Sequence, residues 1–183
     1  DNRKATVDTR ITPNSVIRTG RNSKVIFAVG KDAFILRERS KLELKGGDSI
    51  IRSLRMVTGK LLSVFGRREQ NQRMRISTTV ATIGIRGTGV YVEAEEDRSY
   101  VCTCYGTADI EAVNDPDSRE TVVTRHHDSP RYIRANAVRG AAIEAAAVIN
   151  HTDEELELIE TLVGRSVPFA FGGDYDSSRS TDY

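Results

Sequence analysis

The first two thirds of the chain consist of short segments in which apolar and polar residues alternate. Val25, Phe27 and Val29 lie two positions apart, and Phe34 and Leu36 repeat this spacing after a glycine-containing turn. Successive side chains of a strand point to opposite faces, so this spacing predicts strands with one buried face.

Similar segments follow at regular intervals. Further strands are expected at residues 42–44, 61–65, 76–85, 90–92, 100–105, 108–112 and 121–124. Gly59 and Gly106 are expected to turn the chain between neighbouring segments. Many short strands of even spacing predict a mainly β fold, either a β-sandwich or a β-roll or solenoid-like domain, with a small α-helical C-terminal extension.

The last third of the chain changes character. Residues 134–149 are rich in alanine and could form a helix. A clearer helix is expected after Thr152, because Glu155 three positions later completes a capping box and Gly164 is a natural residue after a helix end. The apolar face of this helix is expected to consist of Leu156, Ile159 and Val163.

These patterns divide the chain into four parts. Residues 1–14 form an N-terminal extension, and residues 15–125 form the β domain. Residues 126–169 are expected to be a linker and a helical segment. Residues 170–183 are rich in glycine, aspartate and serine, which predicts a disordered tail.

Composition narrows the classes of function. The chain has 27 basic and 26 acidic residues among 183, so its charge gives no reason to expect nucleic acid or an anionic membrane surface as a partner. No apolar run approaches the roughly 18 residues of a membrane span. The chain opens at Asp1 without a leader, which fits a cytosolic protein or a mature chain whose leader has been removed.

Cys102 and Cys104 are the only cysteines, and one residue separates them. In a strand they share a face, with Cα atoms about 6.6 Å apart, near the upper limit for a disulfide. Three interpretations are open: two small buried core residues, two thiolates that share a soft metal ion, or a strained redox-active pair.

His126 and His127 are the histidines considered for such a metal site. Adjacent residues in an extended segment point in opposite directions, so one of the two is expected to join the cysteines, with Asp128 as a carboxylate that orients the ring. The alternative is an exposed polar loop end. His151 precedes the capping residue of the predicted helix and is interpreted as a loop residue.

Signatures of catalysis are missing from the sequence. It contains no Gly-x-Ser-x-Gly, no His-Glu-x-x-His, no phosphate-binding loop and no CxxC motif. An enzyme is therefore not expected. Gly87 lies among β-branched residues, which indicates a strand irregularity or, alternatively, a close approach of a ligand to the bare backbone.

The order of these segments resembles the FecR family. The matching pieces are Thr19-Gly20, residues 24–27, 33–36, 40–44, 58–65 and 76–78, the run Ile85-Arg86-Gly87-Thr88-Gly89-Val90-Tyr91-Val92, and Tyr105-Gly106. The most specific piece is the Gly-Thr pair at residues 87–88, followed by one residue and a strand. The resemblance covers about 110 of the 183 residues.

The resemblance implies a periplasmic β domain in the bacterial cell envelope. FecR-type regulators relay signals between an outer-membrane receptor and a sigma factor, so we expect a non-enzymatic binding or signal-relay module with an envelope protein as partner and no cofactor. The alternative is a zinc- or iron-binding or thiol-redox protein that uses Cys102 and Cys104 with His126 or His127. The membrane span and the cytoplasmic segment of a full regulator do not appear in this chain.

Overall fold

A computed structural model describes residues 3–47, 50–68 and 74–169 of the chain. Within these ranges the backbone forms twelve strands and one helix. The elements are β1 (Val16–Arg18), β2 (Val25–Val29), β3 (Asp32–Leu36), β4 (Lys41–Gly47), β5 (Ile50–Val64), β6 (Met74–Ser77), β7 (Ala81–Ile85), β8 (Gly89–Ala94), β9 (Arg98–Ala112), β10 (Asp115–Thr124), β11 (Arg131–Arg134), β12 (Ile143–Ala145) and α1 (Asp153–Leu162). The disorder expected at 170–183 lies outside the described residues.

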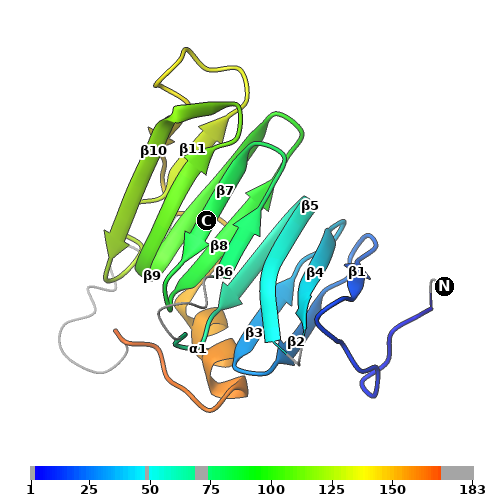
Figure 1. Cartoon of the computed structure of the whole chain (residues 1–183). Helices are drawn as coiled ribbons and strands as arrows, with labels where there is room; N and C mark the ends of the chain where they lie inside the picture. The colour runs from blue at the N-terminus through cyan, green and yellow to red at the C-terminus, as the bar shows by residue number, and fades with distance from the viewer. Residues whose placement is uncertain (1–2, 48–49, 69–73, 170–183) are drawn as a thin grey trace.

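The strands form two sheets that share their two longest members (Figure 1). Sheet A contains β1, β4, the first part of β5, β6, β7, the last part of β9, and β10. Sheet B contains β2, β3, the last part of β5, β8, the first part of β9, β11 and β12.

The shared strands close a ring. β5 pairs with β6, β6 with β7, β7 with β9, β9 with β8, and β8 with β5 again. The β5–β6 pairing is parallel, and the other four are antiparallel. The mainly β prediction is confirmed, and in finer detail the fold is a closed five-stranded barrel extended by further strands rather than a clear sandwich or solenoid.

Gly59 and Gly106 are the positions where β5 and β9 pass from one sheet to the other. β5 pairs with β4 up to Thr58 and with β8 from Gly59 onward. β9 pairs with β8 up to Tyr105 and with β10 from Gly106 onward. Both glycines have left-handed backbone angles, with φ of +96° and +90°. The expected turns at these glycines are therefore bends inside continuous strands.

The space at the two bends also requires glycine. A Cβ atom on Gly59 would lie 2.1 Å from the Ser40 Oγ and 2.6 Å from the Ser40 Cα. A Cβ atom on Gly106 would lie 2.6 Å from the Thr88 Oγ1 and 3.0 Å from the carbonyl oxygen of Gly87. Ser40, directly before β4, and Thr88, directly before β8, can thus approach the bends only because no side chain is there.

Two apolar clusters stabilise the barrel. One fills the interior between the sheets and includes Leu54, Leu61, Ile83 and Val101. The other lies on the outer face of sheet B and includes Ile35, Leu62, Tyr91, Tyr100, Cys102, Cys104, Leu156 and Ile159. Helix α1 contacts β3 and β5 and covers this outer cluster (Figure 1). The outer face of sheet B is therefore a second core.

Helix α1 forms where its cap was predicted. The side chain of Thr152 accepts a hydrogen bond from the Glu155 amide, and the Glu155 carboxylate accepts one from the Thr152 amide. Gly164 follows the helix with φ of +73°. Arg37 of sheet B donates to Glu155 at 2.6 Å and to the carbonyl of Asn150 at 2.7 Å, so both the helix and the chain before it are attached to the sheet.

The possible helix at 134–149 is not formed. Instead, β11 pairs with β9, and β12 pairs with β11. Ile133 and Ala142 are buried in the interior cluster. Pairing with an open strand edge and burial of these residues outweigh the helix propensity of the alanines, because propensity is a weak preference that tertiary contacts override. Sheet B thus continues beyond residue 125.

Two other segments differ in detail from the sequence prediction. Residues 76–85 form two strands, β6 and β7, because the Thr78 hydroxyl accepts hydrogen bonds from the amides of Val80 and Ala81 and stabilises a tight turn. Gly87 lies in the turn between β7 and β8 with φ of +63°. The nearest atom to a Cβ there is the Arg67 Cα at 4.0 Å, so Gly87 is needed for its backbone angle and not for close packing.

We predict that alanine at Gly59 or Gly106 destabilises the protein far more than alanine at Gly87. The left-handed backbone angle alone costs an alanine about 1–2 kcal/mol, which is the expected effect of Gly87→Ala. At Gly59 and Gly106 the overlap with backbone or buried atoms should add about 1–3 kcal/mol. Urea unfolding of the three variants tests this order, and equal midpoints would contradict the role assigned to the two bends.

Candidate functional site

The first part of β9 places both cysteines on the covered face of sheet B. Val101 points into the barrel interior, whereas Cys102 and Cys104 belong to the outer cluster, as the alternation of a strand requires. Both cysteines have 0% exposure and neither is in a disulfide.

His127 lies beside this pair, in the loop that follows β10. Its backbone amide donates to the carbonyl of Cys104 at 2.9 Å, which fixes the loop against β9. Its Nδ1 atom lies 3.3 Å from the Sγ of Cys102. Of the two adjacent histidines, His127 is therefore the one that lies beside the cysteines.

His151 is the residue that the sequence interpretation missed. It has 2% exposure, and its ring stacks on Tyr91 with the ring centroids 4.4 Å apart. Its Nε2 atom lies 3.0 Å from the Nδ1 of His127, and its Nδ1 atom lies 2.6 Å from the carbonyl oxygen of Ile149. The sequence holds no signal that pairs His151 with His127. The two residues meet only because α1 packs on sheet B.

His126 points away from the cysteines toward Asp153, the first residue of α1. Its Nε2 atom lies 2.8 Å from the Asp153 Oδ2, while the His127 Nε2 lies 3.0 Å from the Oδ1 of the same carboxylate. The carboxylate that orients His127 is thus Asp153. Asp128, considered for this role, instead accepts hydrogen bonds from Thr124 and from the Arg125 amide in its own turn.

These contacts shift the ionisation of the cluster. The hydrogen bond from Cys104, followed by those from His127 and His151, lowers the pKa of the Cys102 thiol against the effect of burial. Burial raises the pKa of the Cys104 thiol. Burial also opposes charge on His127, but its hydrogen bonds to Asp153 and Cys102 raise the pKa of the imidazole to about 9.

The arrangement offers a closed set of four donor atoms. One atom each from Cys102, Cys104, His127 and His151 lie within 4.8 Å of one another. A sulfur, an imidazole and a carboxylate in series also occur around nucleophilic cysteines. Cys102 is fully buried, however, so a substrate cannot reach its sulfur without opening the outer cluster.

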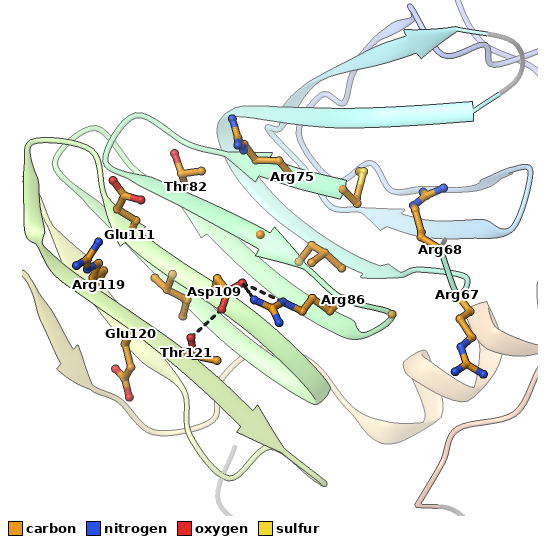
Figure 2. A pocket seen from close by; sticks show the side chains of 15 residues that line it. Arg67, Arg68, Arg75, Thr82, Arg86, Asp109, Glu111, Arg119, Glu120 and Thr121 are labelled. Carbon is orange, nitrogen blue, oxygen red and sulfur yellow. Dashed lines mark hydrogen bonds and ion pairs between the residues drawn. The ribbon is translucent and has the colours of Figure 1, made fainter. Parts of the chain in front are cut away.

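A second candidate site is a polar groove of about 890 Å³ on the outer face of sheet A. Figure 2 shows the charged and hydroxyl side chains that line it, which come from β6, β7, β9 and β10 and from the segments after β5 and β7. Its charged and hydroxyl lining includes Arg75, Thr82, Arg86, Asp109, Glu111, Arg119 and Thr121. The sequence analysis did not identify this groove.

Asp109 organises the middle of this groove. The Arg86 guanidinium donates to the Asp109 Oδ2 at 3.0 and 2.6 Å, and the Thr121 hydroxyl donates to the Oδ1 at 2.7 Å (Figure 2). The groove therefore presents both signs of charge, a surface suited to a polar partner more than to an apolar ligand.

Among the residues that the structure describes, no helix is both long enough and apolar enough to cross a membrane.

Comparison with known proteins assigns the first part of the chain to a family. A family model described as "FecR protein" matches residues 2–109. No curated protein sequence matches the chain significantly.

Solved structures with a similar fold also exist. Two crystal structures from Parabacteroides distasonis ATCC 8503, each described as a "putative anti-sigma factor", have TM-scores of 0.58 with 14% and 12% sequence identity. Each comparison covers 73% of this chain and 59% of the other, so the chain spans about three fifths of the length of these proteins.

We predict that the helix α1 protects the two thiols. Leu156→Ala removes a fully buried side chain from the outer cluster, and we expect a loss of about 2–5 kcal/mol and faster labelling of Cys102 and Cys104 by a thiol probe. Leu158→Ala, in the same helix but 51% exposed, is the matched control and should leave the labelling rate unchanged. Both are measured on reduced, metal-free protein, and equal rates would contradict the protective role of α1.

Proposed function

The chain belongs to the FecR family, and from this premise we propose that it is a non-enzymatic signal-relay module that binds a protein partner in the bacterial periplasm. The observation that carries the proposal is the family match over residues 2–109, which extends from the N-terminal region through β8 and into the last part of β9. The matched region thus contains every strand that closes the barrel, with β9 included up to Asp109.

The fold comparison supports a regulatory role. The similar solved structures are each described as a "putative anti-sigma factor", a name that denotes a regulator of another protein. Cys102, whose sulfur lies beside the His127 imidazole, has 0% exposure, so a substrate cannot reach it. This burial also favours binding over catalysis. We therefore propose binding, without catalysis, as the activity of this module.

The groove on sheet A is the surface that we assign to the partner. Most of its lining comes from strands that pair directly in the sheet, so those side chains are held at fixed spacing. The lining combines arginine, carboxylate and threonine side chains. A polar protein segment with charges of both signs has the complementary chemistry, and complementary charge favours the right partner over wrong ones.

We predict that a photo-crosslinking residue at Arg75 captures an envelope protein in cells of the source bacterium. Adding Arg86→Glu should remove the crosslink, because it places a second negative charge beside Asp109. The exposed Arg86–Asp109 pair contributes at most about 1 kcal/mol to stability, so folding should persist.

The control is the same crosslinker at Arg139, which is 84% exposed and lies outside the groove. It should not capture that protein. Identical products from both positions, or a crosslink that survives Arg86→Glu, would contradict the assignment of the groove.

We also predict that the natural protein carries this module outside the cytoplasm. A fusion of the full gene product to an alkaline phosphatase, which is active only after export, should give phosphatase activity. A fusion to a reporter that is active only in the cytoplasm should be inactive. Activity of that fusion would contradict the periplasmic location.

A further inference from the structure

We propose that Cys102, Cys104, His127 and His151 form a buried tetrahedral site for one zinc ion. The four residues come from three separate parts of the chain: strand β9, the loop after β10, and the segment that precedes α1. Two thiolates and two imidazoles are a donor set that zinc prefers in closed structural sites. The proposal does not depend on the relay function.

The hydrogen bonds of the two imidazoles occupy one nitrogen of each ring and direct the other nitrogen toward the cluster. The Nδ1 of His151 lies 2.6 Å from a carbonyl oxygen, which only accepts, so this nitrogen carries a proton and the Nε2 faces His127. The Nε2 of His127 lies 3.0 Å from the Asp153 carboxylate and donates to it, so the His127 Nδ1 faces His151 and Cys102.

The His127 Nδ1 and the His151 Nε2 therefore face each other at 3.0 Å. Without a metal ion, a single proton on the His127 Nδ1 can join the two rings in one hydrogen bond. A cation at the centre replaces that proton and contacts both imidazoles and both sulfurs at once.

The size of the cluster fits a zinc ion after small side-chain movements. Bonds of about 2.3 Å to sulfur and about 2.0 Å to nitrogen place tetrahedral ligands about 3.3–3.8 Å apart. The His127 Nδ1 lies 3.0 Å from the His151 Nε2 and 3.3 Å from the Cys102 Sγ, and no pair of donor atoms is separated by more than 4.8 Å. Side-chain movements of a few tenths of an ångström to about one ångström bring the four donor atoms to these separations.

The surroundings supply the second layer of contacts that zinc sites require. Asp153 orients His127, and the carbonyl of Ile149 orients His151. With both cysteines ionised and both imidazoles neutral, the charge of the zinc ion cancels that of the two thiolates, which suits a site with no exposed sulfur.

A second group of possible ligands shares one of these residues. His126, His127 and Asp153 are also close together, but they offer three donors in a partly exposed position. Since a closed zinc site uses four protein ligands, we assign the ion to the buried set and assign His126 to the support of Asp153.

Zinc at this place would join two parts of the fold. Both cysteines lie inside the segment that matches the family, whereas both histidines lie beyond it. The ion would hold the loop after β10 and the start of α1 against β9, so that the C-terminal segment stays on sheet B.

The test is zinc loading of the full 183-residue chain under reducing conditions, followed by removal of free metal and elemental analysis. We expect one zinc per chain in the wild type and in His126→Gln, the adjacent control. Cys102→Ser and His151→Gln should each lose the bound zinc. Asp153→Asn should weaken zinc binding by about 10–100-fold. Circular dichroism establishes that each variant is folded.

Cobalt provides a readout that does not depend on the folding of variants. In the wild-type chain, cobalt should give the visible absorption of a tetrahedral ion and the near-ultraviolet charge-transfer band of thiolate ligation. Reduced, folded wild type without bound zinc would overturn the proposal, and so would a cobalt spectrum without the thiolate band. Zinc that survives Cys102→Ser but is lost in His126→Gln would also overturn it, by placing the ion in the exposed group.

Discussion

The fold depends on two bends where only glycine fits. Gly59 and Gly106 combine a left-handed backbone angle with close contacts to Ser40 and Thr88 that leave no room for a Cβ atom. They let β5 and β9 take part in both sheets, and the ring of five paired strands closes through these two strands. The interior cluster and the two outer faces follow from this closure, because a closed ring separates an inside from an outside along every strand.

Strand β9 carries both candidate sites, one on each side of its bend. Before Gly106, Cys102 and Cys104 lie on the outer face of sheet B, where α1 covers them. After Gly106, Asp109 and Glu111 line the open groove of sheet A. One strand thus contributes a buried, closed cluster and an open, solvent-exposed surface, and the difference arises because α1 packs on sheet B, over the cysteines.

The C-terminal segment completes the fold, although its alanine-rich composition favours a helix and does not indicate strands. β11 and β12 extend sheet B, and α1 supplies Leu156 and Ile159 to the outer cluster. Its attachment uses polar contacts as well: Arg37 bonds to Glu155, and the hydroxyl of Tyr100 donates to the carbonyl of Ala147. The histidine cluster lies at this junction, so its geometry depends on the same packing.

Much of this protein could be predicted from local signals in the sequence. Alternation at Val25–Val29, the capping box at Thr152 and the shared face of Cys102 and Cys104 all depend on residues close together in the chain, where backbone geometry alone decides the outcome. The order of strands also sufficed to suggest the family.

Only the tertiary structure decided the remaining features, because each depends on contacts between distant residues. The bends at Gly59 and Gly106 resembled turns, since nothing local shows that the pairing continues on another sheet. Part of the alanine-rich stretch became strand β12 because β11, which is itself paired with β9, offered it an edge. His151 joined His127 because α1 packs on sheet B, and Asp153 rather than Asp128 became the carboxylate partner of His127 for the same reason.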